Sequence, residues 1–342
     1  MSQQQRIGAR PTLEEVALRA GVGRGTASRV INGSPKVSER ARAAVLRAID
    51  ELGYVPNRVA QMLASKRTNT VALVVSEKED RVFGEPYFAG IIRGISSGLT
   101  GTGVQLLLAL AQSEAEHERL EQYLTGQHVD GILLISLHGN DPLPQRLEES
   151  GVPTVLGGMP VGLDPVSYVD ADNCGGALQA VAHLVGIGRR RIATITGPQD
   201  MKVGVDRLSG YHQALRAASL DDAPELVVQG DFSETSGIAA MRTLVARSPD
   251  LDAVFAASDP MALGAMQVLR EHGRRIPDDV AVVGFDDSAS ARHADPPLTT
   301  VHQPLETMGR EMTRLLLARV SGEPLDNPVV ILDTHLVIRE SA

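Results

Sequence analysis

The stretch TLEEVALRAGVGRGTASRVINGSP, residues 12–35, decides how the N-terminal part of the chain folds. Thr12 and Glu15 have the spacing of a capping box, in which each side chain caps the other residue's backbone at the start of a helix. Apolar residues follow at positions 13, 16, 17 and 20, which is helical spacing. Gly21 suits the left-handed conformation that ends many helices. The sequence therefore predicts a helix that starts after Thr12 and stops at Gly21.

The glycines at positions 21, 23 and 25 raise the alternative of a phosphate-binding loop. A dinucleotide-binding loop follows a buried strand and would need a glycine where Thr26 stands. A Walker loop would need Gly-Lys followed by Ser or Thr, which this stretch lacks. Because the glycines follow a predicted helix, we interpret them as a turn between two helices.

Two more helices are predicted after this turn. The second runs from about Arg24 to Ile31 and is expected to bury Ala27 and Val30 while it exposes Arg24, Gly25, Ser28 and Arg29. A cluster of turn residues, 32–35, separates it from a third helix, which Ser38 can cap and which ends near Leu52. The apolar stripe of this third helix is expected to be Val45, Leu46, Ile49 and Leu52. Such an arrangement is a helix-turn-helix, a unit whose second helix enters the major groove of DNA.

The distribution of charge agrees with a polyanionic partner for this N-terminal unit. The whole chain of 342 residues has a net charge of −9. Residues 1–70, however, hold 12 Lys and Arg against 5 Asp and Glu, whereas the remaining 272 residues hold 21 against 37. A basic module joined to an acidic body is typical of a nucleic-acid partner for the basic module.

After residue 70, short apolar runs alternate with helical patterns, for example TVALVV (70–75) followed by FAGIIRGISSGL (88–99). This alternation predicts an α/β core of two doubly wound parallel sheets, one on each side of about residue 170. No apolar run approaches the roughly 20 residues of a membrane span, and residues 1–11 contain no apolar segment of the kind found in a signal peptide. With its single cysteine, Cys174, the chain is expected to be a cytoplasmic protein that does not contact membranes.

The sequence offers little support for an enzyme or for a bound cofactor. The run His117-Glu118-Arg119-Leu120-Glu121 lacks the second histidine of a zinc-binding helix, and the nine histidines show no metal-ligand spacing. No G-x-S-x-G run stands at the turn between a strand and a helix, which is the place of a nucleophile elbow. We therefore expect no enzymatic activity, no metal and no cofactor.

Residues 12–76 resemble the N-terminus of the LacI family of bacterial repressors, in TLEEVALRAGV, TASRVINGSPKVSERAR and LGYVPNRVAQMLASKRTNTVALVV. The rest resembles the periplasmic-binding-protein-like core of that family, with landmarks at 206–211, 258–269, 282–287 and 298–304. The resemblance implies a helix-turn-helix at 10–56, a hinge helix and linker at 57–68, and an effector-binding and dimerisation core at 69–342. Within the core it implies one subdomain of 69–168 and 302–331 and another of 169–301 and 332–342.

The resemblance also implies which residues contact DNA. Arg24, Gly25 and Arg29 stand where relatives contact base edges, and the two arginines imply G·C pairs in each half-site because a guanidinium matches guanine. Gly23 stands where relatives have a capping serine, and we expect the helix to form nevertheless. Leu63 stands where relatives insert a leucine into the minor groove. The full set expected at the DNA is Thr12, Arg24, Gly25, Thr26, Ser28, Arg29, Asn32, Tyr54, Asn57, Arg58 and Leu63.

In the core, the resemblance implies a ligand held between the two subdomains. Arg207 and Asp286 stand where relatives hydrogen-bond the hydroxyls of a sugar, and fixed carboxylate and guanidinium groups suit a polyol. For aromatic residues near strand ends, such as Tyr87, two roles stay open: stacking on a sugar ring, or packing in the core. The residues expected at the effector are Tyr87, Phe88, Asp172, Arg207, Ser258, Asp286 and Gln303.

Within the family, the chain is similar to actinobacterial repressors of cellulose and cello-oligosaccharide use. The similar runs are GVGRGT (21–26), FGEPYFAG (83–90) and EHERLEQYLTGQHVDGILLISLH (116–138). The resemblance implies a homodimeric repressor that binds near-palindromic, double-stranded operator DNA and is released by a small sugar, with cellobiose favoured. A regulator of the same family that uses its sugar as corepressor, and a soluble sugar-binding protein without regulatory role, are the alternatives.

Overall fold

The computed structural model describes residues 11–32, 34–55, 67–111, 114–162 and 167–342. The chain divides into two compact units, Met1–Thr68 and Asn69–Ala342. The helix-turn-helix fold of the first unit and the parallel sheets of the second confirm the predicted fold class. Expected residues Asn57, Arg58 and Leu63 lie outside the described residues.

The first unit consists of α1 (Leu13–Ala20), α2 (Arg24–Ile31) and α3 (Glu39–Leu52). The predicted capping box is confirmed, because the Glu15 amide donates to Thr12 Oγ1 at 3.3 Å and the Thr12 amide donates to Glu15 Oε2 at 2.7 Å. Gly21 ends α1 with φ of 66°. Gly23 precedes α2 without a side-chain cap, and the helix forms nevertheless, as predicted.

Two details of this unit differ from the prediction. Leu46 is 50% exposed, and Ala48 takes its place in the apolar cluster with Val45. Positions 45, 48, 49 and 52 share one helical face, whereas position 46 is turned about 100° from position 45. Ser28 is half-buried rather than exposed.

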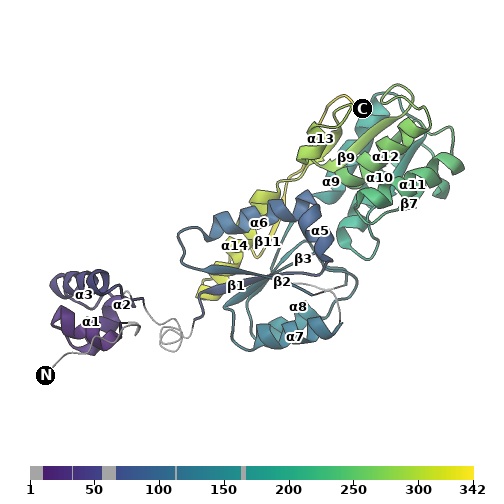
Figure 1. Cartoon of the computed structure of the whole chain (residues 1–342). Coiled ribbons are helices and arrows are strands. Elements are labelled where there is room, and N and C mark those ends of the chain that lie inside the picture. The colour runs from purple at the N-terminus through teal and green to yellow at the C-terminus, as the bar shows by residue number, and fades with distance from the viewer. Residues whose placement is uncertain (1–10, 33, 56–66, 112–113, 163–166) are drawn as a thin grey trace. The chain divides into compact units, whose positions relative to one another are not determined.

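The second unit is built from two lobes, each with a six-stranded sheet (Figure 1). The first lobe has the strand order β11-β5-β4-β3-β1-β2, and all its pairs are parallel. Its strands are β1 (Thr70–Val75), β2 (Gln105–Leu110), β3 (Gly131–Ile135), β4 (Thr154–Gly157), β5 (Tyr168–Ala171) and β11 (Val329–Leu332). Its helices are α5 (Glu79–Gly84), α6 (Pro86–Leu99), α7 (Glu114–Thr125), α8 (Leu143–Glu149) and α14 (Leu305–Ser321).

The second lobe has the order β12-β10-β9-β8-β6-β7, in which only the β10–β12 pair is antiparallel. Its strands are β6 (Ile192–Thr196), β7 (Val227–Gln229), β8 (Ala253–Ala256), β9 (Ala281–Asp286), β10 (Thr299–His302) and β12 (His335–Val337). Its helices are α9 (Asn173–Gly186), α10 (Lys202–Ala217), the short 3-10 helix η1 (Pro224–Leu226), α11 (Glu234–Arg247), α12 (Asp259–Glu271) and α13 (Ala289–Arg292).

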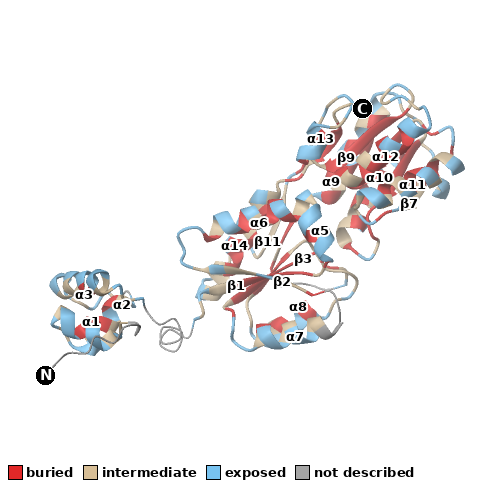
Figure 2. Ribbon diagram, in the orientation of Figure 1, coloured by how far each residue is buried: buried red, intermediate tan, exposed pale blue. Residues whose placement is uncertain are grey.

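Helices cover both faces of each sheet, so the strands are buried between them (Figure 2). In the first lobe, α6 and α14 pack on one face, and α7 and α8 pack on the other. In the second lobe, α9 and α10 cover one face, and α11 and α12 cover the other. This is why the strands are continuous apolar runs rather than alternating ones.

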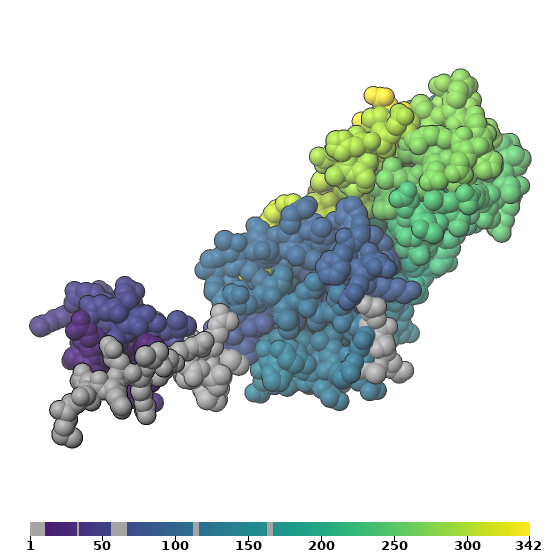
Figure 3. Space-filling view, viewed as in Figure 1, coloured from purple at the N-terminus to yellow at the C-terminus, as the bar shows by residue number. Residues whose placement is uncertain are grey.

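The chain passes between the lobes three times: between β5 and α9, between β10 and α14, and between β11 and β12. The lobes pack against each other, the first largely blue and teal and the second green and yellow in Figure 3. The carboxyl ends of several parallel strands, including β3, β5 and β9, lead into the segments that line the space between the lobes. Such ends are where parallel sheets bind ligands.

The close packing of α6 on α14 depends on Gly94. A Cβ added at Gly94 would lie 2.2 Å from the backbone oxygen of Glu306 on α14, so the two helices would have to separate. We expect Gly94→Ala to lower the free energy of unfolding of the core by roughly 3 kcal/mol. The matched control is Gly186→Ala at the exposed end of α9, where the added Cβ meets nothing within 4 Å. Equal thermal unfolding midpoints for the two variants would contradict this account.

Candidate DNA-binding helices and effector cavity

On the first unit, α2 presents the side chains that the sequence predicted for base contact. Arg24, Gly25 and Arg29 are exposed, whereas Ala27 and Val30 pack into the apolar cluster beneath. The Arg24 guanidinium is not free, because its Nε lies 3.0 Å from Glu14 Oε1 on α1. Both side chains are more than half exposed, so this ion pair contributes little stability and breaks readily.

The other predicted DNA contacts in this unit have structural partners. Thr12 is exposed and caps α1, and Thr26 is half-buried in the first turn of α2. Asn32 Nδ2 donates to Ser28 Oγ at 3.4 Å, and Tyr54 packs against the apolar cluster. None of these contacts tests whether the residues bind DNA, so that role stays a prediction.

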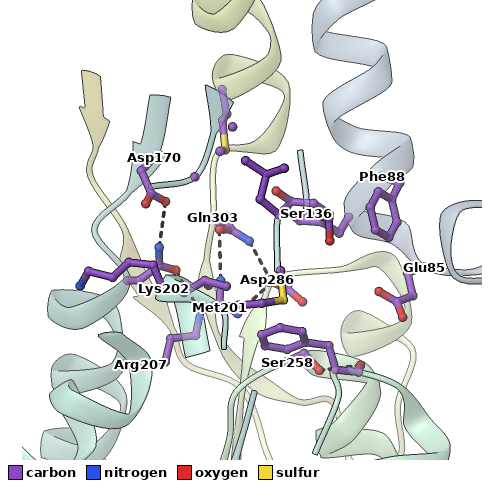
Figure 4. A pocket seen from close by; sticks show the side chains of 18 of the residues that line it. Glu85, Phe88, Ser136, Asp170, Met201, Lys202, Arg207, Ser258, Asp286 and Gln303 are labelled. Atoms are coloured by element: carbon purple, nitrogen blue, oxygen red, sulfur yellow. Dashed lines mark hydrogen bonds and ion pairs between the residues drawn. The ribbon is translucent and has the colours of Figure 1, made fainter. Parts of the chain in front are cut away.

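A cavity lies between the two lobes of the second unit, with about 850 Å³ of empty space including its open mouth. Its walls combine charged, amide, hydroxyl, apolar and aromatic groups, the mixture expected of a small polar ligand's site. Figure 4 shows the polar side chains converging from both lobes. Residues that line it are Arg81, Glu85, Pro86, Tyr87, Phe88, Ser136, Leu137, Gly157, Gly158, Met159, Pro160, Asp170, Asn173, Met201, Lys202, Val203, Arg207, Phe232, Ser258, Pro260, Asp286, Gln303 and Met308.

Arg207, on α10, is the centre of the polar network in this cavity. It is only 3% exposed, and its three nitrogens donate to Asn173 Oδ1 at 3.0 Å, to the Ala257 carbonyl at 2.6 Å and to Gln303 Oε1 at 3.2 Å. Its guanidinium also lies 3.6 Å from the ring centre of Phe285. A planar donor held on several sides in this way has a fixed orientation, which is what recognition of a ligand's hydroxyl requires.

Asp286, at the end of β9, faces Arg207 at 3.8 Å and accepts a hydrogen bond from Gln303 Nε2 at 2.9 Å (Figure 4). Burial raises the pKa of Asp286 to about 8, although the Arg207 guanidinium opposes that shift. The carboxyl can therefore donate as well as accept a hydrogen bond near neutral pH. Its backbone has φ of 125°, a conformation rare outside glycine and often found at binding sites.

Asp172 is predicted from the sequence to contact the effector, but its side chain does not line the cavity. Asp172 is exposed, does not line the cavity and caps α9, accepting from the Gly175 amide at 2.8 Å. Asp170, two residues earlier on β5, lines the cavity instead and accepts from Asn173 Nδ2 at 2.9 Å. The signal that separates them is local: Asp172 stands directly before a helix and three residues before the Gly175 amide, which is the position of an N-cap.

Other predicted effector residues do line the cavity, and they differ in burial and in the contacts that their side chains already make. Tyr87 and Phe88, at the start of α6, form an edge-to-face pair with ring centres 5.2 Å apart. Phe88 is 1% exposed and packs in the apolar core of the first lobe, whereas Tyr87 is half-buried, and burial raises the pKa of its phenol. Ser258 caps α12, and its hydroxyl donates to the Phe232 carbonyl at 2.9 Å. Cavity residues that the sequence analysis did not select are chiefly Arg81, Glu85, Ser136, Asn173, Lys202 and Phe232.

Across 11–32, 34–55, 67–111, 114–162 and 167–342, no group of three or more His, Cys, Asp or Glu side chains is arranged to hold a metal ion. No helix in those ranges is long and apolar enough to cross a membrane. The polar side chains that line the cavity can donate and accept hydrogen bonds, as a polyhydroxylated ligand requires.

Two family models match the chain. One, described as bacterial regulatory proteins of the lacI family, matches residues 12–57, and the other, a periplasmic binding protein-like domain, matches residues 181–342. The chain is 60% identical over 334 residues to the HTH-type transcriptional regulator CelR of Thermobifida fusca, covering 97% of this chain and 98% of that protein. It is 35% identical to the HTH-type transcriptional repressor PurR of Edwardsiella ictaluri, covering 96% of each.

Solved structures similar to the whole chain include a complex of the transcriptional regulator CelR with cellobiose. That match has a TM-score of 0.79 and 59% identity, and it covers 97% of this chain and 100% of that one. A lac repressor dimer bound to operator and to the anti-inducer ONPF matches with a TM-score of 0.85 and 28% identity, over 97% and 99% of the two chains.

Proposed function

Because the chain belongs to the LacI family of bacterial regulatory proteins, we propose that it represses transcription and that cellobiose or a related cello-oligosaccharide releases it from its operator. The observation that carries this proposal is the 60% identity to CelR, which extends over 97% of the chain and so includes both the DNA-binding helices and the cavity. The similar CelR structure holds cellobiose.

The residues give this function a physical basis. We propose that Arg24 and Arg29 each bond a guanine in the major groove, so that each half-site contains G·C pairs. A homodimer would place two such helices on a near-palindromic operator, as the lac repressor dimer is bound to its operator. The expected hinge contacts Asn57, Arg58 and Leu63 belong to this proposal on the resemblance alone.

In the core, we propose that Arg207, Asp286 and Gln303 bind hydroxyls of the sugar and that Tyr87 packs against a ring face. Asp170 and Asn173 join this set because they line the cavity and adjoin Arg207. Polar groups of this kind fix a polyol's orientation, while apolar walls exclude water. The sugar would then favour one arrangement of the lobes. In that arrangement the DNA-binding units would have a lower affinity for the operator. By thermodynamic reciprocity, bound operator would lower the affinity of the protein for the sugar.

We further propose the domain limits that the sequence predicts: 10–56 for DNA binding, 57–68 for the hinge and linker, and 69–342 for the core. A regulator that works on operator DNA acts in the bacterial cytoplasm. The relatives named above are regulators, and we propose no catalytic activity for this chain.

Operator release by cellobiose is tested by fluorescence anisotropy of a labelled duplex from the DNA upstream of this gene, at fixed salt concentration. We expect tight binding to the duplex and its reversal by cellobiose, with maltose, a disaccharide of the same size and different linkage, as the control. Tighter binding in the presence of cellobiose would instead establish a corepressor. Binding that ignores both sugars would contradict cellobiose as the effector, and binding of cellobiose by a protein that holds no operator would favour the non-regulatory alternative.

A further inference from the structure

A polar contact joins the two lobes at a point outside the three crossing segments. His138 lies in the loop that follows β3 in the first lobe, and Asp200 lies in the loop between β6 and α10 in the second. His138 Nδ1 is 2.9 Å from Asp200 Oδ2, and the adjacent Gly139 amide donates to the Asp200 carbonyl at 2.9 Å. The two lobes are therefore tied by side chain and backbone at one place.

The other nitrogen of the same imidazole contacts a second carboxylate. His138 Nε2 is 3.1 Å from Glu77 Oε1, and Glu77 is only 8% exposed. Glu77 also accepts from Ser136 Oγ at 2.8 Å and pairs with Arg81 Nη1 at 2.7 Å. A neutral imidazole can donate from only one nitrogen, so hydrogen bonds to both carboxylates require the imidazolium.

The surrounding charges favour that protonated form. The hydrogen bond to Glu77 is the largest cause that raises the pKa of His138 above its ordinary value, and Asp200 adds to it, while partial burial opposes the shift. Arg81 is the nearby cation, and it is engaged by Glu77 and Glu85 in the first lobe and attracted by Asp231 of the second. The imidazole thus contacts two carboxylates, while the guanidinium of Arg81 is engaged by Glu77 and Glu85.

The contact lies at the rim of the cavity on both sides. In the first lobe, Ser136 and Leu137 line the cavity and immediately precede His138. In the second lobe, Met201 and Lys202 line it and immediately follow Asp200. A change in the His138–Asp200 distance would therefore move cavity-lining backbone from both lobes.

We propose that His138 is a positioning residue for the effector: as an imidazolium it ties Glu77 to Asp200 and holds the lobes in the arrangement that encloses the cavity. This proposal rests on the proposed function, since the effector is its ligand. The tie is complete where the imidazole is protonated, and it weakens as the pH rises through the raised pKa of His138. Effector affinity is then higher at pH 6.0 than at pH 8.5.

The test is calorimetric titration of the full chain with cellobiose at pH 6.0 and 8.5, for wild type, His138→Gln and Asp200→Asn. Glutamine keeps a hydrogen-bonding side chain but has no charge to lose. We expect both variants to bind roughly three- to fivefold more weakly than wild type at pH 6.0 and to differ little from wild type at pH 8.5, as fits one partly exposed ion pair. The matched control is His212→Gln, because His212 Nδ1 pairs with Asp222 Oδ1 at 2.5 Å within the second lobe alone. It should keep the wild-type pH dependence.

A second measurement needs no effector: the titration of the His138 ring by NMR in the free protein. The wild-type ring should titrate above its ordinary pKa of about 6.5, and Asp200→Asn should lower that value. The proposal would be overturned if His138→Gln bound cellobiose with the affinity and the pH dependence of wild type. It would also be overturned if the variant lost the same factor of affinity at both pH values, because an equal loss indicates a merely structural role. Absence of cellobiose binding by wild type would contradict the proposed effector, and an unshifted His138 titration in that protein would overturn the tie itself.

Discussion

Replacement of Arg207 by alanine is expected to abolish the response to effector while operator binding is retained. Arg207 is buried, and its guanidinium is the group around which Asn173, Gln303 and Asp286 are arranged. A hydrogen bond that involves a charged group contributes roughly 1.5–3 kcal/mol, so loss of two such bonds to a sugar lowers affinity about a hundredfold or more. Cellobiose at a concentration that releases wild type should leave the Arg207→Ala complex with operator intact in the anisotropy assay.

The alanine variant also leaves the buried oxygens of Asn173 and Gln303 without the guanidinium that donates to them, which lowers the stability of the core. Arg207→Lys separates this effect from recognition, because lysine keeps the charge but lacks the planar fork that spans Asn173 and Gln303. We expect Arg207→Lys to unfold near the wild-type temperature and still bind cellobiose at least tenfold more weakly. A lysine variant that is released like wild type would remove Arg207 from the sugar site.

The sequence was most informative where a structural signal acts within a few residues. Thr12 and Glu15 cap α1, Gly21 ends it, and Ser38 caps α3, and each of these was predicted and confirmed. The doubly wound sheets were predicted for the same reason, because each strand–helix pair leaves its own local pattern. Leu46 was misplaced because choosing between neighbouring positions at the edge of an apolar stripe depends on the exact packing angle of α3.

The cavity depends on contacts that are far apart in sequence. Arg207 and Gln303 were selected only through the resemblance, and the structure brings them together across 96 residues. Asp172 and Asp170 could not be told apart from composition, because both are acidic and lie at the same strand end; helix capping by Asp172 decides between them. His138 and Asp200 belong to different lobes and share no motif, so only the packing of the lobes reveals their contact.

On the DNA side, substitution of Arg24 by alanine is expected to lower operator affinity about a hundredfold or more. A bidentate arginine–guanine contact contributes roughly 1–3 kcal/mol of discrimination, and in a homodimer each substitution removes the contact from both half-sites. In the free protein Arg24 pairs with Glu14, and this exposed pair gives way at little cost when a base competes for the guanidinium. Glu14→Ala should therefore change affinity for the operator only slightly, and in the direction of tighter binding.

The control for Arg24 must remove the same charge from the same unit without removing a base contact. Arg19, on α1, serves because its guanidinium pairs with Glu51 on α3 at 2.5 Å and is more than half exposed. If Arg24 contacts a guanine, Arg24→Ala relaxes the preference for G·C at one position of each half-site, whereas Arg19→Ala weakens binding to all duplexes alike and reduces its salt dependence. Equal losses on operator and on random duplex for both variants would mean that Arg24 acts only through its charge. Base recognition by this unit would then have to come from Arg29 and its neighbours on α2.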